Sequence, residues 1–114
     1  MAARRHDVAM AEVVLVYVTC ADADEARRIG RTLVEERLAA CVNLRAHETI
    51  YRWQGAIESG PEWALIAKTT RDGFARLRDR VAALHSYTVP CIVALPVADG
   101  LAAYLDWVGD EVGG

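Results

Sequence analysis

The sequence lacks the basic excess and the long apolar run that two large classes of protein require. Its 13 lysines and arginines stand against 16 acidic residues, which gives a net charge of −3. Because nucleic-acid binders neutralise phosphates with basic side chains, this balance argues against nucleic acid as a partner. A membrane helix needs about 20 apolar residues, and the uncharged stretch that includes His85–Ala98 holds two prolines. We therefore expect neither a nucleic-acid partner nor a membrane span.

Cysteine is scarce, and the three that are present are far apart. Cys20, Cys41 and Cys91 form no CxxC pair. An odd, widely spaced set argues against a disulfide framework and against a zinc knuckle or a redox motif. Free thiols are typical of a reducing compartment, so we expect a cytoplasmic protein.

The N-terminal residues carry little structural information. Asp7 and Glu12 interrupt the valine- and alanine-rich run there, and no small-residue cleavage site follows, which argues against a signal peptide. We expect residues 1–11 to form a disordered lead, with either Met1 or Met10 as the start. Residues 12–112 have the length and the 54% hydrophobic content of one folded domain.

Recognised catalytic motifs are missing. No glycine-rich phosphate loop of the GxGxxG or GxxxxGK[ST] type occurs, and the only serines, Ser59 and Ser86, lie outside any GxSxG elbow. The acidic stretch Ala21–Asp24 after the first apolar run would repel a phosphate. We therefore expect a protein that is not an enzyme and has no obligatory cofactor.

Hydrophobic periodicity predicts alternating strands and helices. Val13–Thr19 is short, β-branched and apolar, which is typical of a strand buried on both faces. Asp22, with Glu25 three positions later, predicts the start of an amphipathic helix over Asp24–Leu38. The remaining expected elements are β segments over Ala39–Leu44 and Thr49–Trp53, a turn at Gln54-Gly55, a loop at Ser59-Gly60-Pro61, a strand over Trp63–Thr70, a helix from about Arg71 to Leu84, a strand over Cys91–Leu95 and a short helix from Asp99-Gly100.

This order, βαββαβ with an extra C-terminal helix, predicts an α+β, ferredoxin-like sandwich. Its two main helices would cover one face of the sheet and leave the other uncovered, although the strands read as apolar on both sides. Since most soluble assemblies are closed homo-oligomers, a second copy of the chain is the expected cover.

Cys41 and His85 are the candidate metal ligands, because a thiol and an imidazole together suit copper or zinc. They stand at the start of the second strand and the end of the second main helix, which this topology could bring near each other. The alternative is structural: Cys41 as a small buried side chain, and His85 as a favourable group at a helix C-terminus. Cys20 and Cys91 fit better as core or strand-end thiols.

Lys68 and the large aromatic side chains also allow two interpretations. Lys68 lies within an apolar strand, either as an edge lysine that reaches solvent or as a paired lysine that lines a cleft. The aromatics could stack RNA bases, but the RRM motif is missing and the charge opposes it. Packing between subunits is the better explanation for them. They are Tyr51, Trp53, Trp63, Tyr87, Tyr104 and Trp107.

A series of short motifs follows in order over about Val13–Val108. The motifs are Val18-Thr19-Cys20, Arg37-Leu-Ala-Ala-Cys-Val-Asn43, Tyr51-x-Trp53-x-Gly55-x-Ile57, Glu62 leading into Lys68-Thr69, His85-x-Tyr87, Pro90, Ala94-Leu-Pro-Val97 and Tyr104-Leu-x-Trp107. Each is common alone, and the series in register resembles the CutA family, the divalent-cation tolerance proteins.

The resemblance implies a ferredoxin-like protomer in a tight, intertwined homotrimer. It matches Cys41 and His85 to positions discussed as copper ligands. It matches further residues to a cleft between subunits, namely Tyr51, Trp53, Lys68, Tyr87 and Trp107. The implied function is response to, or tolerance of, divalent metal ions, with copper as the expected ion. The alternative is a signalling or scaffold trimer, similar to the PII proteins, that binds a small molecule or a protein partner in that cleft.

The sequence departs from the family pattern beside His85. The family's His-Pro-Tyr is here His85-Ser-Tyr87, and its Glu-Val-Pro-Glu is Thr88-Val-Pro-Cys91. Two carboxylates are therefore absent, and any metal scheme that relies on them does not transfer. Cys91 adds a thiol near the same position.

Overall fold

A computed structural model describes residues 12–113, so the expected disordered lead and the choice between Met1 and Met10 lie outside the described residues. The elements follow the expected order. They are β1 (Val13–Cys20), α2 (Ala23–Glu35), β2 (Cys41–Trp53), β3 (Ala56–Thr70), α3 (Phe74–Leu84), β4 (Ile92–Pro96) and α4 (Ala102–Glu111). No helix within residues 12–113 is long and apolar enough to cross a bilayer.

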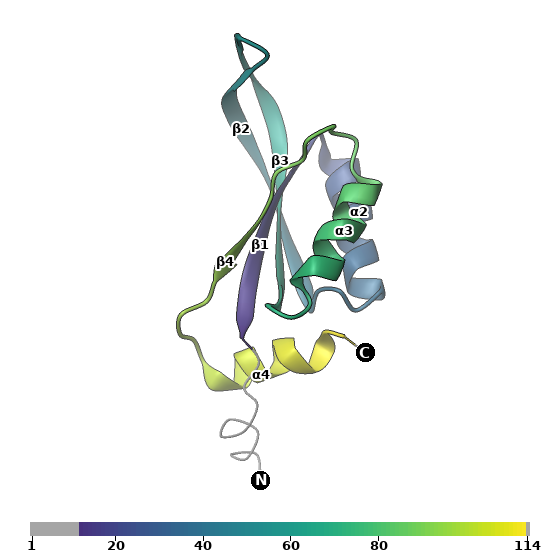
Figure 1. Ribbon diagram of the computed structural model, residues 1–114, viewed down its shortest axis with the longest axis vertical. Helices are drawn as coiled ribbons and strands as arrows, with labels where there is room; N and C mark the ends of the chain where they lie inside the picture. Colours follow the sequence, from purple (N-terminus) through teal and green to yellow (C-terminus); the bar gives the residue numbers. More distant parts are fainter. Residues whose placement is uncertain (1–11, 114) are drawn as a thin grey trace.

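The four strands form one antiparallel sheet in the order β2-β3-β1-β4. The helices α2 and α3 lie side by side against one face of this sheet, as Figure 1 shows. This is the predicted α+β, ferredoxin-like sandwich with an added C-terminal helix. The strand β1 is central because it pairs with β3 along one edge and with β4 along the other. Its side chains therefore point alternately to the two faces of the sheet.

The core forms because successive residues of β1 point to opposite faces. Val14, Val16 and Val18 face the helices and are buried there with Ile29, Leu33, Leu77 and Val81. Leu15 and Tyr17 point to the other face and are only partly buried. Within one chain β1 is therefore fully buried on the helix side only, and burial of its other face by a second copy stays a prediction.

The N-terminus of α2 is capped as the sequence predicts. The Asp22 carboxylate accepts the backbone N–H of Glu25 at 2.9 Å, and the Glu25 carboxylate accepts the N–H of Ala21 at 2.9 Å. The helix ends earlier than Leu38, because Arg37 has a left-handed backbone with φ 60°. Leu38 then donates its N–H to the Leu33 carbonyl at 2.8 Å and turns the chain toward β2.

The strands β2 and β3 form one long hairpin, which corrects the expected loop at Ser59-Gly60-Pro61. These three residues pair with Ile50, Thr49 and Glu48. Proline is tolerated in this part of β3 because β1 pairs with β3 only from Trp63 to Thr70, so that residues 56–62 form an edge next to β2 alone. The predicted turn at Gln54-Gly55 is present, and both residues have the positive φ that a tight hairpin turn needs.

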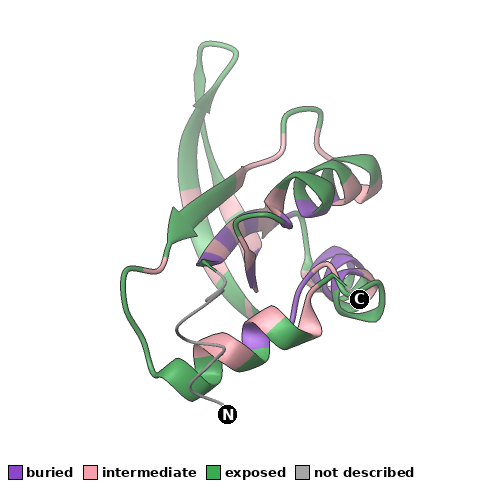
Figure 2. Ribbon diagram, turned by 60° about the horizontal axis from the view of Figure 1, so that its bottom comes forward, coloured by how far each residue is buried: buried purple, intermediate pink, exposed green. Residues whose placement is uncertain are grey.

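Much apolar surface remains uncovered on the face opposite α2 and α3, here called the open face. The helix α4 covers one end of it, where Val108 packs against Val13. Beyond α4, Val93 and Leu95 of β4 are 49% and 50% exposed. The end of the hairpin projects past the helices and is exposed almost throughout (Figures 1 and 2), with Ile50 at 77%. Cover by a second chain, which the sequence led us to expect, therefore stays a prediction.

The described core gives a matched stability test on α2. Leu33→Ala removes a fully buried side chain and should lower the free energy of unfolding by about 2–5 kcal/mol. Val34→Ala, next to it and 40% exposed, should change that free energy by no more than about 0.5 kcal/mol. Urea denaturation at one fixed protein concentration measures both. Equal losses for the two variants would contradict this assignment of the core.

Candidate functional site

The candidate residues fall into three groups. The Cys41 cluster (Cys41, Asn43, Lys68, Tyr104) lies on the open face beside α4. The His85 cluster (Cys20, Glu25, His85) lies where α3 ends beside the ends of β1 and the start of α2. The Glu62 pocket is a cavity of about 680 Å³ between the hairpin and the segment that joins α3 to β4.

The Cys41 cluster is built by strand pairing. Cys41 is directly opposite Lys68, so their side chains leave the sheet on the same face. The Lys68 ammonium donates to the Cys41 sulfur at 3.5 Å and to the Asn43 side-chain oxygen. The Tyr104 hydroxyl lies 3.6 Å from the same sulfur, and this contact, together with burial, raises the pKa of Tyr104. Lys68 therefore has side-chain partners, and its place in a cleft between subunits stays a prediction.

Trp107 belongs beside this cluster. Its ring lies 5.7 Å from the Tyr104 ring, and both residues are partly exposed on α4. The site thus presents a thiol, an ammonium group and two aromatic rings on one surface.

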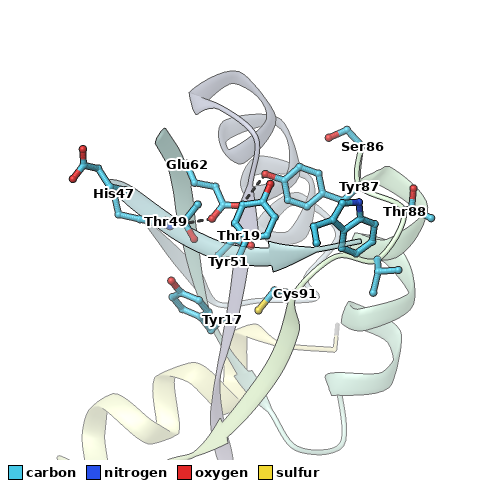
Figure 3. A pocket seen from close by; sticks show the side chains of 13 residues that line it. Tyr17, Thr19, His47, Thr49, Tyr51, Glu62, Ser86, Tyr87, Thr88 and Cys91 are labelled. Atoms are coloured by element: carbon cyan, nitrogen blue, oxygen red, sulfur yellow. Dashed lines mark hydrogen bonds and ion pairs between the residues drawn. The ribbon is translucent and has the colours of Figure 1, made fainter. Parts of the chain in front are cut away.

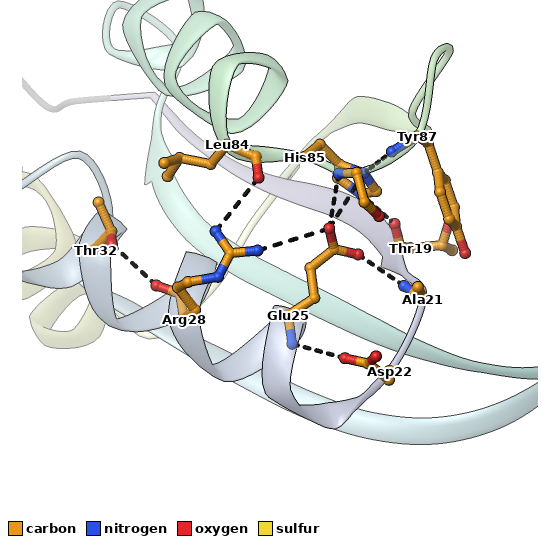
Figure 4. Close-up of polar contacts among 10 residues, drawn as sticks. Thr19, Ala21, Asp22, Glu25, Arg28, Thr32, Leu84, His85 and Tyr87 are labelled. Atoms are coloured by element: carbon orange, nitrogen blue, oxygen red, sulfur yellow. Dashed lines mark hydrogen bonds and ion pairs between the residues drawn. The ribbon is translucent and has the colours of Figure 1, made fainter.

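The His85 side chain is fully buried, and both of its ring nitrogens are in use (Figure 4). Nδ1 accepts the backbone N–H of Tyr87 at 3.0 Å. Nε2 is then the protonated nitrogen, and it donates to the Thr19 carbonyl at 2.7 Å. Neither nitrogen has a free lone pair for a metal ion unless one of these hydrogen bonds breaks.

Glu25 ties His85 to the start of α2. One carboxylate oxygen accepts from Ala21, and the other accepts the N–H of Ser86 at 2.7 Å and lies 3.8 Å from His85 Nδ1. Burial alone would raise the pKa of Glu25, but the hydrogen bonds from Ala21 and Ser86 outweigh it, so the pKa is lowered from 4.5. Glu25 therefore holds the chain after α3 in place as a charged acceptor.

The His85 cluster has the spacing of a metal site but not the chemistry. The candidate ligand atoms of Cys20, Glu25 and His85 lie within 4.8 Å of one another. Burial, with the nearby charges of Glu25 and Glu62, raises the pKa of the Cys20 thiol to about 12. A metal would have to remove that proton and break a hydrogen bond of His85. The cluster fits a structural role better than a metal centre.

The Glu62 pocket has a hydrogen-bonded carboxylate at its centre (Figure 3). Tyr87 donates its hydroxyl to Glu62 at 2.8 Å, and His47 Nε2 lies 3.2 Å from the other Glu62 oxygen. Burial and the bond to Glu62 raise the pKa of Tyr87, and burial with the Glu62 charge raises that of Cys91. The lining residues are Tyr17, Thr19, His47, Glu48, Thr49, Tyr51, Trp53, Glu62, Ser86, Tyr87, Thr88, Val89 and Cys91.

The structure divides the residues expected from the sequence. Tyr51, Trp53 and Tyr87 line the Glu62 pocket, whereas Lys68 and Trp107 lie at the Cys41 cluster. One chain alone therefore does not assemble the five cleft residues.

The expected ligands Cys41 and His85 are also apart within one chain. Cys41 pairs with Lys68, which is opposite Leu15, whereas His85 contacts Thr19. Leu15 and Thr19 are four residues apart along β1, which corresponds to about 13 Å. Their use as ligands of one ion stays a prediction, and it requires a second chain or a rearrangement.

His47 and Glu25 are site residues that the sequence interpretation missed. The alternation of β2 places His47 on the same face as Thr49, Tyr51 and Trp53, which is a signal the sequence does contain. The role of Glu25 beside His85 depends on a contact between residues 60 positions apart, which no local pattern reveals.

Comparisons with known proteins agree with the resemblance. Residues 14–111 match the family described as "CutA1 divalent ion tolerance protein". The chain is 52% identical over 105 residues to the divalent-cation tolerance protein CutA of Thermus thermophilus, covering 91% of this chain and 100% of the relative. The solved periplasmic divalent cation tolerance protein CutA of Archaeoglobus fulgidus has a TM-score of 0.87 at 44% identity, covering 89% and 99% of the two chains. CutA1 from Oryza sativa has a TM-score of 0.88 at 33% identity, covering 91% and 96%.

The Glu25 network predicts a pH-dependent loss of stability. Glu25→Gln keeps the shape but loses the charge and leaves one buried N–H facing an amide group. At pH 7 it should cost about 1–3 kcal/mol of unfolding free energy. Because the folded-state pKa of Glu25 is lowered, its contribution is present above pH 4.5 and is lost as the pH falls through that lowered value. The difference in unfolding free energy between the native protein and Glu25→Gln should therefore become smaller in acid.

Thermal denaturation of both proteins between pH 3 and pH 7 measures this difference in stability. Glu35→Gln, on the same helix with a 64% exposed side chain, is the matched control and should show no difference at any pH. A difference for Glu25→Gln that stays constant down to pH 3 would contradict the assigned role.

Proposed function

Because the chain belongs to the CutA1 divalent ion tolerance family, we propose that it is a homotrimeric metal-response protein that binds copper or a similar soft divalent ion. We propose that it acts in the cytosol and without catalysis, in line with its three free cysteines and the absence of a catalytic motif from the sequence. The single observation that carries the metal proposal is the partly exposed Cys41 thiol among polar side chains.

Two unlike apolar surfaces support the homotrimer. The open face exposes Val93 and Leu95, and the hairpin exposes Ile50 and Ile57. A contact between the hairpin of one copy and the open face of the next joins two different surfaces, and such contacts form a closed ring when the rotation between copies closes on itself. Three copies is the number that the family resemblance implies. The same contact would bring the Glu62 pocket of one copy toward the Cys41 cluster of another and so unite the cleft residues.

Cys41 is the ligand best suited to copper in this chain. Its sulfur is a soft donor, and it lies partly exposed within hydrogen-bond distance of Lys68 and Tyr104. The Lys68 ammonium must turn away when a cation binds, which it can do because its stem is flexible. His85 is a second ligand only where its bond to the Tyr87 amide opens, so the proposal places Cys41 first.

A second candidate function has its own observation. The Glu62 pocket has the volume of a small-molecule site, and four aromatic side chains line it together with polar groups. It supports the alternative of a PII-like signalling or scaffold trimer that binds a ligand or a protein partner in the cleft. The two functions use different residues and can be tested separately.

The copper proposal predicts a specific loss. Cys41→Ser should weaken copper binding about tenfold or more, because the ligand sulfur is gone. Cys91→Ser, which removes the thiol that lines the Glu62 pocket, should weaken copper binding less than Cys41→Ser does, because the proposal places Cys41 first. Binding should also weaken as the pH falls, because protons compete for the ligands. Native mass spectrometry and competition with a chelator of known affinity measure the stoichiometry and the affinity.

The role of His85 is tested in the same series. Copper binding that survives in the double variant Cys41→Ala, His85→Ala would overturn this site. Equal losses from Cys91→Ser and Cys41→Ser would show that the protein binds copper through thiols without preference for Cys41.

A further inference from the structure

The lining of the Glu62 pocket is rich in aromatic and acidic groups. Its aromatic residues are Tyr17, Tyr51, Trp53 and Tyr87, and its carboxylates are Glu48 and Glu62. Among the lining residues that the structure describes there is no lysine or arginine. Aromatic rings attract cations to their faces, and a carboxylate attracts them by charge.

Strand alternation explains why these side chains gather. Thr49, Tyr51 and Trp53 are alternate residues of β2 and point to the open-face side of the hairpin. Glu62 pairs with His47, so it points the same way from β3. Figure 3 shows Tyr51 and Tyr87 near Glu62, with Tyr17 and Cys91 on the side toward α4.

Gly60 precedes Glu62 on this face of β3. It is directly opposite Thr49 and therefore on the same face as the lining residues of β2. A Cβ built at Gly60 would meet no heavy atom within 4 Å. The glycine thus leaves a gap in the row of side chains between Glu58 and Glu62.

Glu62 is held in place but not neutralised by a permanent cation. Its side chain is only 12% exposed, and its one ion-pair partner among residues 12–113 is His47. The bonds from Tyr87 and His47 use two of the carboxylate's four or so acceptor positions. The others can accept hydrogen bonds from a ligand, in a setting that solvent screens only partly.

We propose that the Glu62 pocket binds a small organic cation, an amine or a quaternary ammonium ion, with its charge beside Glu62 and its carbon atoms against the tyrosine and tryptophan rings. This inference rests on the second candidate function and names its ligand class. A free anion would face two carboxylates. A hard metal ion prefers about six to eight oxygen ligands, and the lining residues supply only two carboxylates, those of Glu48 and Glu62.

Choline and its uncharged analogue 3,3-dimethylbutan-1-ol are the paired probes, because they share a shape and differ in charge. Spermidine serves as the amine probe. Calorimetric titration of the purified assembly measures affinity. The chain has three tryptophans, so the fluorescence change that is lost in Trp53→Leu is the signal of Trp53. We expect choline or spermidine to bind and the alcohol to bind at least about tenfold more weakly.

The variants assign the binding to this pocket. Glu62→Gln and Trp53→Leu should each weaken cation binding about tenfold or more. Glu35→Gln on α2 is the matched control for the loss of a carboxylate and should leave cation binding unchanged. Circular dichroism and the mass of the assembly check that each variant folds, and the half-exposed position of Trp53 makes its replacement tolerable.

Several outcomes overturn the inference. The first is equal binding of choline and the alcohol, and the second is full cation binding by Glu62→Gln. The third is cation binding that appears only in Lys68→Met, because it would mean that the lysine of another copy already fills the pocket. Binding of ATP, lost in Trp53→Leu, would keep the cleft function but overturn the organic cation. Cys41→Ser should bind choline as the native protein does. Failure of the copper proposal can therefore be told apart from failure of the organic-cation proposal.

Discussion

The two faces of the sheet are covered unequally, and the rest of the structure depends on this. β1 alternates its side chains between the faces, and α2 and α3 seal only the side of Val14, Val16 and Val18. On the other side α4 reaches only the end near Val13. Since burial of apolar surface is the main stabilising force, the exposed remainder is the strongest physical reason to expect an assembly.

The buried network around His85 links this fold to the pocket. Thr19, Glu25 and Ser86 fix the chain just after α3, and that segment continues into the wall of the Glu62 pocket. His85, which the sequence predicted as a metal ligand, therefore has a structural role first, because it holds the chain after α3 against β1. The shape of the pocket depends on the same hydrogen bonds that occupy its ring nitrogens.

Local sequence patterns predicted the fold well because its signals are local. Asp22 caps α2, and Gln54-Gly55 forms the hairpin turn, as their residue types require. Pro61 led to a wrong prediction of a loop. Proline is acceptable on an edge strand, and Pro61 lies on an edge because β1 ends before it reaches this part of β3, which the local sequence does not show. The separation of Cys41 from His85 depends on strand register over the whole sheet, which short patterns do not encode.

The central claim is that copies of this chain cover one another's open face and hairpin. Sedimentation equilibrium over a hundredfold dilution tests it most directly. The account predicts one species with three times the 12.5 kDa mass of the chain. A single species of 12.5 kDa at every concentration would contradict it, because Ile50, Val93 and Leu95 would then remain in water.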